Sequence, residues 1–142
     1  MGRRKAILVI IALIWLAVLL RITVFRNGCF SNGLFSGRVE WDAFAYYLEL
    51  VREGNWGYFI YLFLGNLLWF VPAGILIRLW GGRLWQAVLA GFLLSLSIET
   101  AQFVLGSGVS ELDDLILNTL GALLGYLGTS LIMRLFSGRN KA

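Results

Sequence analysis

The residues of this chain that could do chemistry are carboxyl and amide side chains placed inside apolar runs. Ser95 lies four positions before Glu99 and Gln102 lies three after it, so the three share one face of a helix. Asp114 and Asn118, four apart, form a second polar face in the next run. A carboxylate in hydrocarbon costs several kcal/mol unless it is protonated, paired or hydrated. Such groups could pair with a cation of the protein, line a ligand cavity, or act as acid or base.

Four apolar runs must position these side chains. Of the 142 residues, 59% are hydrophobic and only 14% are charged, whereas a soluble domain averages about 45–50% and about 25%. A helix needs about 20 apolar residues to cross the hydrocarbon core of a bilayer. The runs cover about residues 6–25, 58–80, 84–106 and 114–136. They predict an all-α membrane protein, a four-transmembrane-helix bundle that forms a single domain over residues 1–142.

The connections between the runs carry further signals. The turn 81–83 (GGR) predicts that the second and third helices are antiparallel neighbours. The first run could be a secretory signal peptide, but no small-residue cleavage site follows it, which favours an uncleaved span. The long first connection predicts a short amphipathic helix at the membrane interface. Its apolar residues recur at helical spacing: Phe44, Tyr47, Leu48 and Val51.

Positive charges predict the orientation of the bundle. With the N-terminus in the cytoplasm, most Lys and Arg residues fall on the inner side, and the connection between the third and fourth runs has none. The basic residues occur in small groups between apolar runs, which is typical of a topology signal and not of a nucleic-acid-binding face. We therefore expect a multi-pass protein of the bacterial cytoplasmic membrane with both termini cytoplasmic.

On that orientation the polar side chains lie at comparable depth near the outer end of the bundle. One interpretation is that Glu99 pairs with Arg21 and stabilises the bundle. The other is a cavity open to the outside, and the two are compatible. The predicted polar cluster, a candidate ligand site, consists of Arg21, Asn66, Ser95, Glu99, Gln102, Asp113, Asp114 and Asn118.

Small residues predict close helix packing. Gly91 lies one turn before Ser95 in the third run, and Gly121, Gly125 and Gly128 follow Asn118 in the fourth. Small side chains let helix backbones approach closely in lipid. We expect Gly91, Gly121 and Gly125 to bring the third and fourth helices together.

The sequence lacks the usual catalytic and cofactor motifs. It has no histidine, a single cysteine, no Gly-rich phosphate loop, no H-E-x-x-H and no nucleophile elbow. Asp113 and Asp114 are adjacent and should point about 100° apart on a helix, which argues against a simple carboxylate pair. We predict no catalytic residue, no metal and no cofactor.

Three motifs together resemble the VanZ-like family of bacterial membrane proteins. They are residues 65–74 (GNLLWFVPAG), 95–102 (SLSIETAQ) and 111–126 (ELDDLILNTLGALLGY). Many members carry Arg and Asp just before the third motif, where this chain has Gly108-Val-Ser-Glu111. The resemblance implies a cell-envelope role, because one member is associated with resistance to teicoplanin, a glycopeptide with an acyl tail.

Three functions remain open at this stage. The first is a non-catalytic envelope protein that binds an amphiphilic or lipid-linked ligand through its outward polar cluster. The second is a structural subunit of an envelope complex. The third is an enzyme acting on a lipid headgroup with Glu99 or Asp114 as acid or base. Membrane lipids are the expected partners in each case, and nucleic acid is not.

Overall fold

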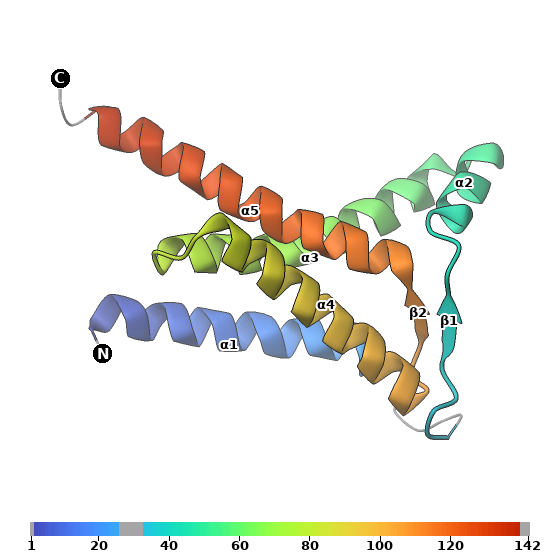
Figure 1. Cartoon of the computed structure of the whole chain (residues 1–142). Coiled ribbons are helices and arrows are strands. Elements are labelled where there is room, and N and C mark those ends of the chain that lie inside the picture. Colours follow the sequence, from blue (N-terminus) through green and yellow to red (C-terminus); the bar gives the residue numbers. More distant parts are fainter. Residues whose placement is uncertain (1, 26–32, 140–142) are drawn as a thin grey trace.

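Four long helices make up most of the computed structural model, which describes residues 2–25 and 33–139 (Figure 1). They are α1 (Arg3–Thr23), α3 (Trp56–Leu79), α4 (Leu84–Leu105) and α5 (Leu112–Arg139). Each is long and apolar enough to cross a membrane. The helices agree with the four predicted spans to within a few residues. The prediction of a helical, multi-pass membrane protein is confirmed.

The short helix expected in the first connection is present as α2 (Ala45–Arg52). It starts later than the apolar pattern indicated and buries Tyr47 and Leu50, whereas Leu48 is 56% exposed. The expected apolar face was therefore partly wrong. The reason is aromatic packing against α3, because the Tyr47 ring meets the rings of Phe59 and Phe63 edge to face.

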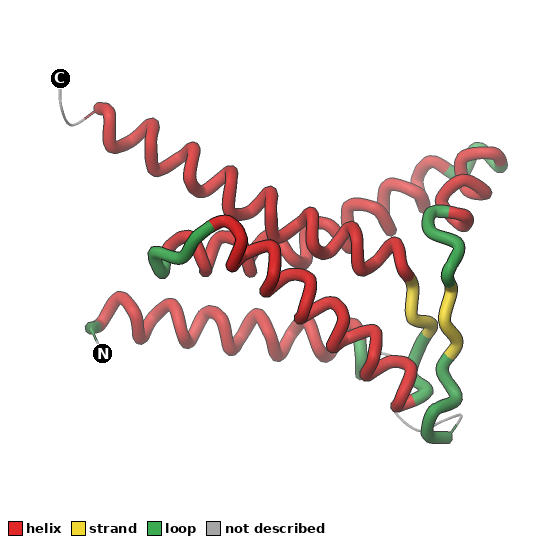
Figure 2. The backbone as a smooth tube through the Cα atoms, in the orientation of Figure 1, coloured by secondary structure: helices red, strands yellow, loops and turns green. Residues whose placement is uncertain are grey.

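Two short strands, absent from the sequence prediction, join the two connections at one end of the bundle (Figure 2). β1 (Arg38–Glu40) pairs in parallel with β2 (Val109–Glu111), with Val39 opposite Ser110. The backbone just before β1 also bonds to the end of α4, where the amides of Phe35 and Gly37 donate to the carbonyls of Val104 and Phe103. Orphan carbonyls at that helix end thereby gain partners. Strands of three residues are too short to produce a readable alternation.

The closest backbone approach is between α3 and α5. A Cβ atom on Gly121 would meet the carbonyl oxygen of Leu67, and one on Gly125 would meet that of Val71. From the other side, a Cβ on Gly74 would meet the backbone of α5. Gly121 and Gly125 therefore pack against α3, and the expectation that they face the third span, α4, was wrong.

Gly91 accounts for the contact of α4 with α5. A Cβ atom there would lie 2.6 Å from the Cβ of Ala122, so the two small residues meet face to face. Gly128, one turn beyond Gly125, has nothing within 4 Å of its Cβ position. The sequence pattern alone did not show that Gly121 and Gly125 contact a neighbouring helix whereas Gly128 does not.

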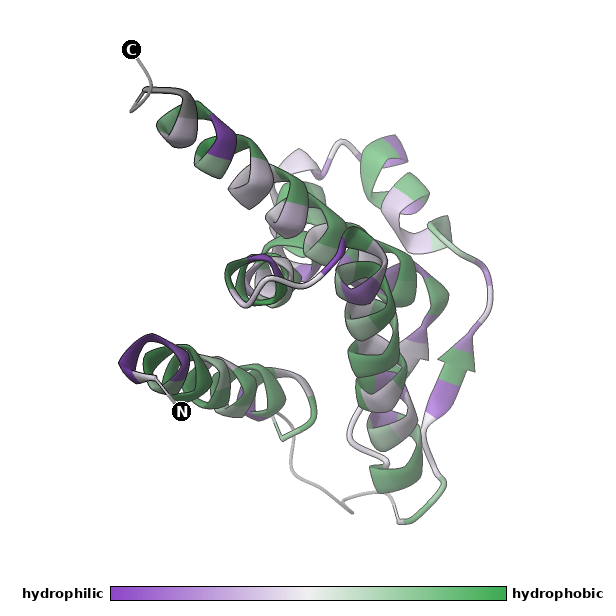
Figure 3. Cartoon of the chain, turned by 60° about the vertical axis from the view of Figure 1, so that its left-hand side comes forward, coloured by the Kyte–Doolittle hydropathy of each residue, from purple (hydrophilic) through white to green (hydrophobic). Residues whose placement is uncertain are grey.

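Helix α1 is attached more loosely. Leu19 and Val24 join Phe70 and Ile98 in a small buried cluster, and the Trp15 indole donates to the Trp69 carbonyl at 2.9 Å. About half of the other apolar side chains of α1 are exposed, among them Ile10, Leu13 and Ile14, and Figure 3 shows that hydrophobic residues predominate along the long helices. Such a surface is what a lipid-facing helix presents.

Candidate functional site

The first polar group at the strand end of the bundle joins α2, α3 and α5. The Asn66 side chain, through Nδ2, donates to the Tyr47 hydroxyl at 3.3 Å and to the carboxylate of Asp114. Burial, and then the charge of Asp114, raise the pKa of the Tyr47 phenol above its ordinary value, so the phenol keeps its proton. This group ties the short helix α2 to the two spans that approach most closely.

The second group joins α4 to α5. Asn118 donates through Nδ2 to the Ser95 hydroxyl at 2.9 Å, and both side chains are buried. The Asn118 Oδ1 atom is buried without a hydrogen-bond partner in the described part of the chain. Interhelical bonds of this kind stabilise helix pairs in lipid by about 0.6–2 kcal/mol.

The third group is centred on Glu99, which is 7% exposed. Its Oε2 accepts the backbone amide of Glu111 at 2.9 Å, and its own backbone carbonyl accepts the Ser110 hydroxyl at 2.6 Å. Both contacts fix strand β2 to helix α4. Asp113 and Asp114 also lie close enough for charge interaction with Glu99.

The carboxyl groups of Glu111, Asp113 and Asp114 converge, with one oxygen of each within 4.8 Å of the others. The adjacent aspartates, expected to point apart, thus have carboxyl oxygens near each other in the first turn of α5. The positive end of the helix dipole favours carboxylates there. The donor set suits a hard divalent cation, but acidic groups are common without one, and we assign no metal to it.

Two residues of the predicted cluster lie elsewhere. Arg21 is exposed and donates to the Phe25 carbonyl at 2.9 Å, at the end of its own helix. The described residues contain no ion pair between Arg21 and Glu99, so that expected pair is wrong. Gln102 turns toward α1, where its Nε2 lies 3.5 Å from the Thr23 carbonyl. The other six residues occupy the three groups above.

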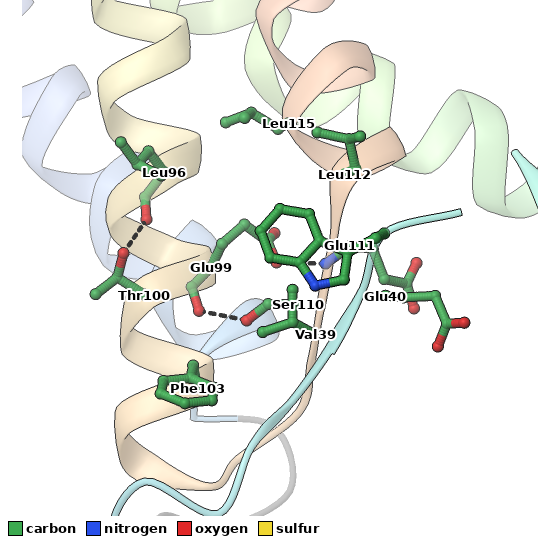
Figure 4. A pocket seen from close by; sticks show the side chains of 11 residues that line it. Val39, Glu40, Leu96, Glu99, Thr100, Phe103, Ser110, Glu111, Leu112 and Leu115 are labelled. Atoms are coloured by element: carbon green, nitrogen blue, oxygen red, sulfur yellow. Dashed lines mark hydrogen bonds between the residues drawn. The ribbon is translucent and has the colours of Figure 1, made fainter. Parts of the chain in front are cut away.

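A cavity of about 280 Å³ lies beside Glu99, between β1, α4 and the start of α5 (Figure 4). We call it the Glu99 cavity. Figure 4 shows Glu99 reaching from α4 toward β2, with Leu112 and Leu115 on one side and Phe103 on the other. Most of its lining is apolar, and its acidic groups come from Glu40, Glu99 and Glu111. The sequence predicted an outward cavity lined by the polar cluster, but of those residues only Glu99 lines this one. Its β1 side comes from a segment expected to be a loop and helix.

The fold and the site define a class of protein: a multi-pass membrane bundle of four long helices, with acidic and amide side chains gathered where two connections pair. The sequence model of the VanZ/LLP1 family matches residues 6–134, and the chain belongs to this family. The resemblance given by the three motifs is therefore confirmed. Neither the curated proteins nor the solved structures contain a match to the chain.

Proposed function

We propose that the chain is a non-catalytic binding protein of the cell envelope, and that the Glu99 cavity holds part of an amphiphilic ligand. The observation that carries the proposal is the combination of apolar walls with a buried carboxyl group in one opening. Ligand sites are commonly apolar concavities with a few polar groups that fix orientation. On the orientation expected from the positive charges, this opening lies on the outer side of the membrane.

The chemistry of the cavity favours a particular kind of ligand. Leu96, Phe103 and Leu115 offer an apolar surface that suits an acyl or prenyl chain. The carboxyl groups of Glu40 and Glu111 offer hydrogen-bond acceptors, which suit an amine or a hydroxyl. A phosphate headgroup would be repelled by these groups and by the nearby aspartates. The proposed ligand is therefore an acylated molecule with amine or sugar hydroxyl groups, and lowered susceptibility to teicoplanin is the phenotype that follows.

The hydroxyl groups of the cavity do not favour the enzyme alternative. Thr100 donates to the Leu96 carbonyl at 2.7 Å, and Ser110 donates to the Glu99 carbonyl at 2.6 Å. A nucleophilic hydroxyl needs an adjacent base to accept its proton, and here each proton is directed at a backbone carbonyl. Glu99 can act as an acid, but no described side chain that lines the cavity with it is an activated nucleophile.

The test is binding of teicoplanin to the purified protein in detergent, compared with the same antibiotic after removal of its acyl tail. Glu99→Gln keeps the shape and removes the charge, and we expect binding at least about tenfold weaker, from loss of a charge-assisted hydrogen bond. Leu96→Trp should also weaken binding by filling the cavity. Glu49→Gln, which removes an exposed carboxylate on α2, is the matched control.

The same variants are then expressed in a Gram-positive host to measure teicoplanin susceptibility. The proposal requires that susceptibility follow binding: unchanged in Glu49→Gln and increased in the two cavity variants. Equal binding by all four proteins, or no binding by any, would exclude the Glu99 cavity as the site. Loss of the phenotype without any measurable binding would instead favour a structural subunit of a larger complex.

A further inference from the structure

A second cavity, of about 350 Å³, lies at the opposite end of the bundle from the strands. We call it the basic cavity. Helix α1 contributes its N-terminal turns to this cavity, and α3 contributes its C-terminal turn. Helix α5 contributes one residue of its second half. Figure 1 shows these parts of the three helices at that end of the bundle. The residues that line it are Arg4, Lys5, Leu8, Arg78, Leu79, Trp80, Gly81 and Met133.

The positive charge of the basic cavity has no acidic side chain beside it in the described part of the chain. The eight acidic residues of the chain fall between positions 40 and 53, at 99, and between 111 and 114, which places them in the strand half. Three cations line one opening, and no ion pair engages them within the described residues. Like charges held this close repel one another, so an anion bound between them lowers the free energy of the folded state.

Arg78 is held in a position suited to an anion. Its Nε donates to the Ser130 hydroxyl at 2.8 Å, and its guanidinium carbon lies 5.8 Å from the centre of the Tyr126 ring. The two terminal nitrogens make no hydrogen bond within the described residues. A guanidinium fixed through Nε presents those nitrogens as a fork, which matches two oxygens of a phosphate.

We infer that the basic cavity binds the phosphate of an anionic phospholipid from the leaflet at that end of the bundle. Leu8, Leu79 and Met133 give the cavity apolar sides next to its cations, which suits the glycerol and first methylenes of a lipid better than a free ion. Trp80 lies at the helix end, where tryptophan marks the headgroup level. Basic pockets between transmembrane helices are known to take anionic headgroups.

The experiment compares lipid retention and thermal stability in nanodiscs. Discs contain either phosphatidylcholine alone or a mixture with phosphatidylglycerol, and native mass spectrometry counts the phosphatidylglycerol molecules that stay bound. We expect the wild-type protein to retain at least one and to melt at a higher temperature in the mixed discs. Arg4→Gln and Arg78→Gln should each weaken retention about fivefold, the effect of one cation at a lipid surface.

Arg134→Gln is the matched control, because it removes an exposed charge on α5 next to Met133 but outside the lining. Arg78→Gln also loses the bond to Ser130, so Arg4→Gln, at an exposed position, separates lipid binding from folding. Equal loss in Arg4→Gln and Arg134→Gln would overturn the inference in favour of general surface attraction. Equal stabilisation of the wild type by inorganic phosphate in phosphatidylcholine discs would overturn it in favour of a soluble anion.

Discussion

The α3–α5 pair and helix α1 are attached to the bundle in opposite ways. In the pair, glycines bring two backbones together, and Gly74, Gly121 and Gly125 leave no room for a side chain. Helix α1 instead touches its neighbours through a few large side chains and leaves about half of its apolar side chains exposed. Four of the polar residues, Asn66, Asp113, Asp114 and Asn118, lie on the close pair. The comparison indicates that backbone contact between α3 and α5 fixes the positions of the polar groups, while α1 packs beside them through side chains alone.

The strongest test of this comparison is Gly125→Leu. A leucine there would displace the Val71 carbonyl, so we expect a loss of more than about 3 kcal/mol and poor recovery of monodisperse protein. Gly128→Leu, one turn on, is the control and should change little, because its Cβ position is open. Thermal unfolding in detergent measures both. Equal melting temperatures for the two variants would mean that α3 and α5 are not in backbone contact.

Removing the Asn118 amide should have the next largest effect. Asn118→Ala deletes the bond to Ser95 and leaves a small void, with an expected loss of about 1–2 kcal/mol. Ser95→Ala removes only the acceptor and leaves the buried Asn118 amide without a hydrogen bond, so a similar loss of stability is expected. The double variant should lose less than the sum of the two single losses. An additive double variant would show that the bond does not couple α4 to α5.

A smaller effect is expected at the attachment of α1. Trp15→Phe keeps most of the ring but loses the bond to the Trp69 carbonyl, with an expected loss of about 0.6 kcal/mol. Hydrogen exchange should report faster opening of α1 with no change in α3 and α5. Equal acceleration in all the long helices would show that α1 is an integral part of the frame.

The smallest effect is expected for Arg21→Gln, because among the described residues this exposed side chain bonds only to the Phe25 carbonyl, just past the end of its own helix. The melting temperature should stay within about 1 °C of the wild type, since surface substitutions rarely exceed ±0.5 kcal/mol. A buried pair with Glu99 would instead make the variant about 3–5 kcal/mol less stable. Such a loss would contradict the separation of α1 from the polar groups.

The sequence predicted the spans well and the site only in part, and the difference has a physical cause. Hydropathy over some twenty residues is a strong local signal, so α1, α3, α4 and α5 could be placed from composition alone. Depth along a helix also brought Asn66 to Asp114 and Ser95 to Asn118. Hydropathy does not determine how each helix is rotated about its axis. For that reason the sequence paired Arg21 with Glu99 and placed Gly121 and Gly125 against α4 instead of α3.

The contact between strands was also beyond sequence reasoning, since it depends on residues far apart in the chain. Val39 and Ser110 belong to connections separated by α2, α3 and α4. Each strand is three residues long, and all three residues of β1 are exposed, so neither has a hydrophobic pattern. The β1 side of the Glu99 cavity follows from this pairing, and therefore could not be predicted either.

The parallel pairing of β1 with β2 has a consequence for the order of assembly. Parallel strands require a long crossover, and here the crossover contains two complete spans, so β1 has no partner until α3 and α4 have been inserted and β2 has been synthesised. Contacts between residues distant in sequence form late, because closing the long loop costs entropy before any bond is gained. Residues 38–40 should thus remain open to protease on a nascent chain and become protected once β2 arrives. Their protection reports that the last helix has reached its place.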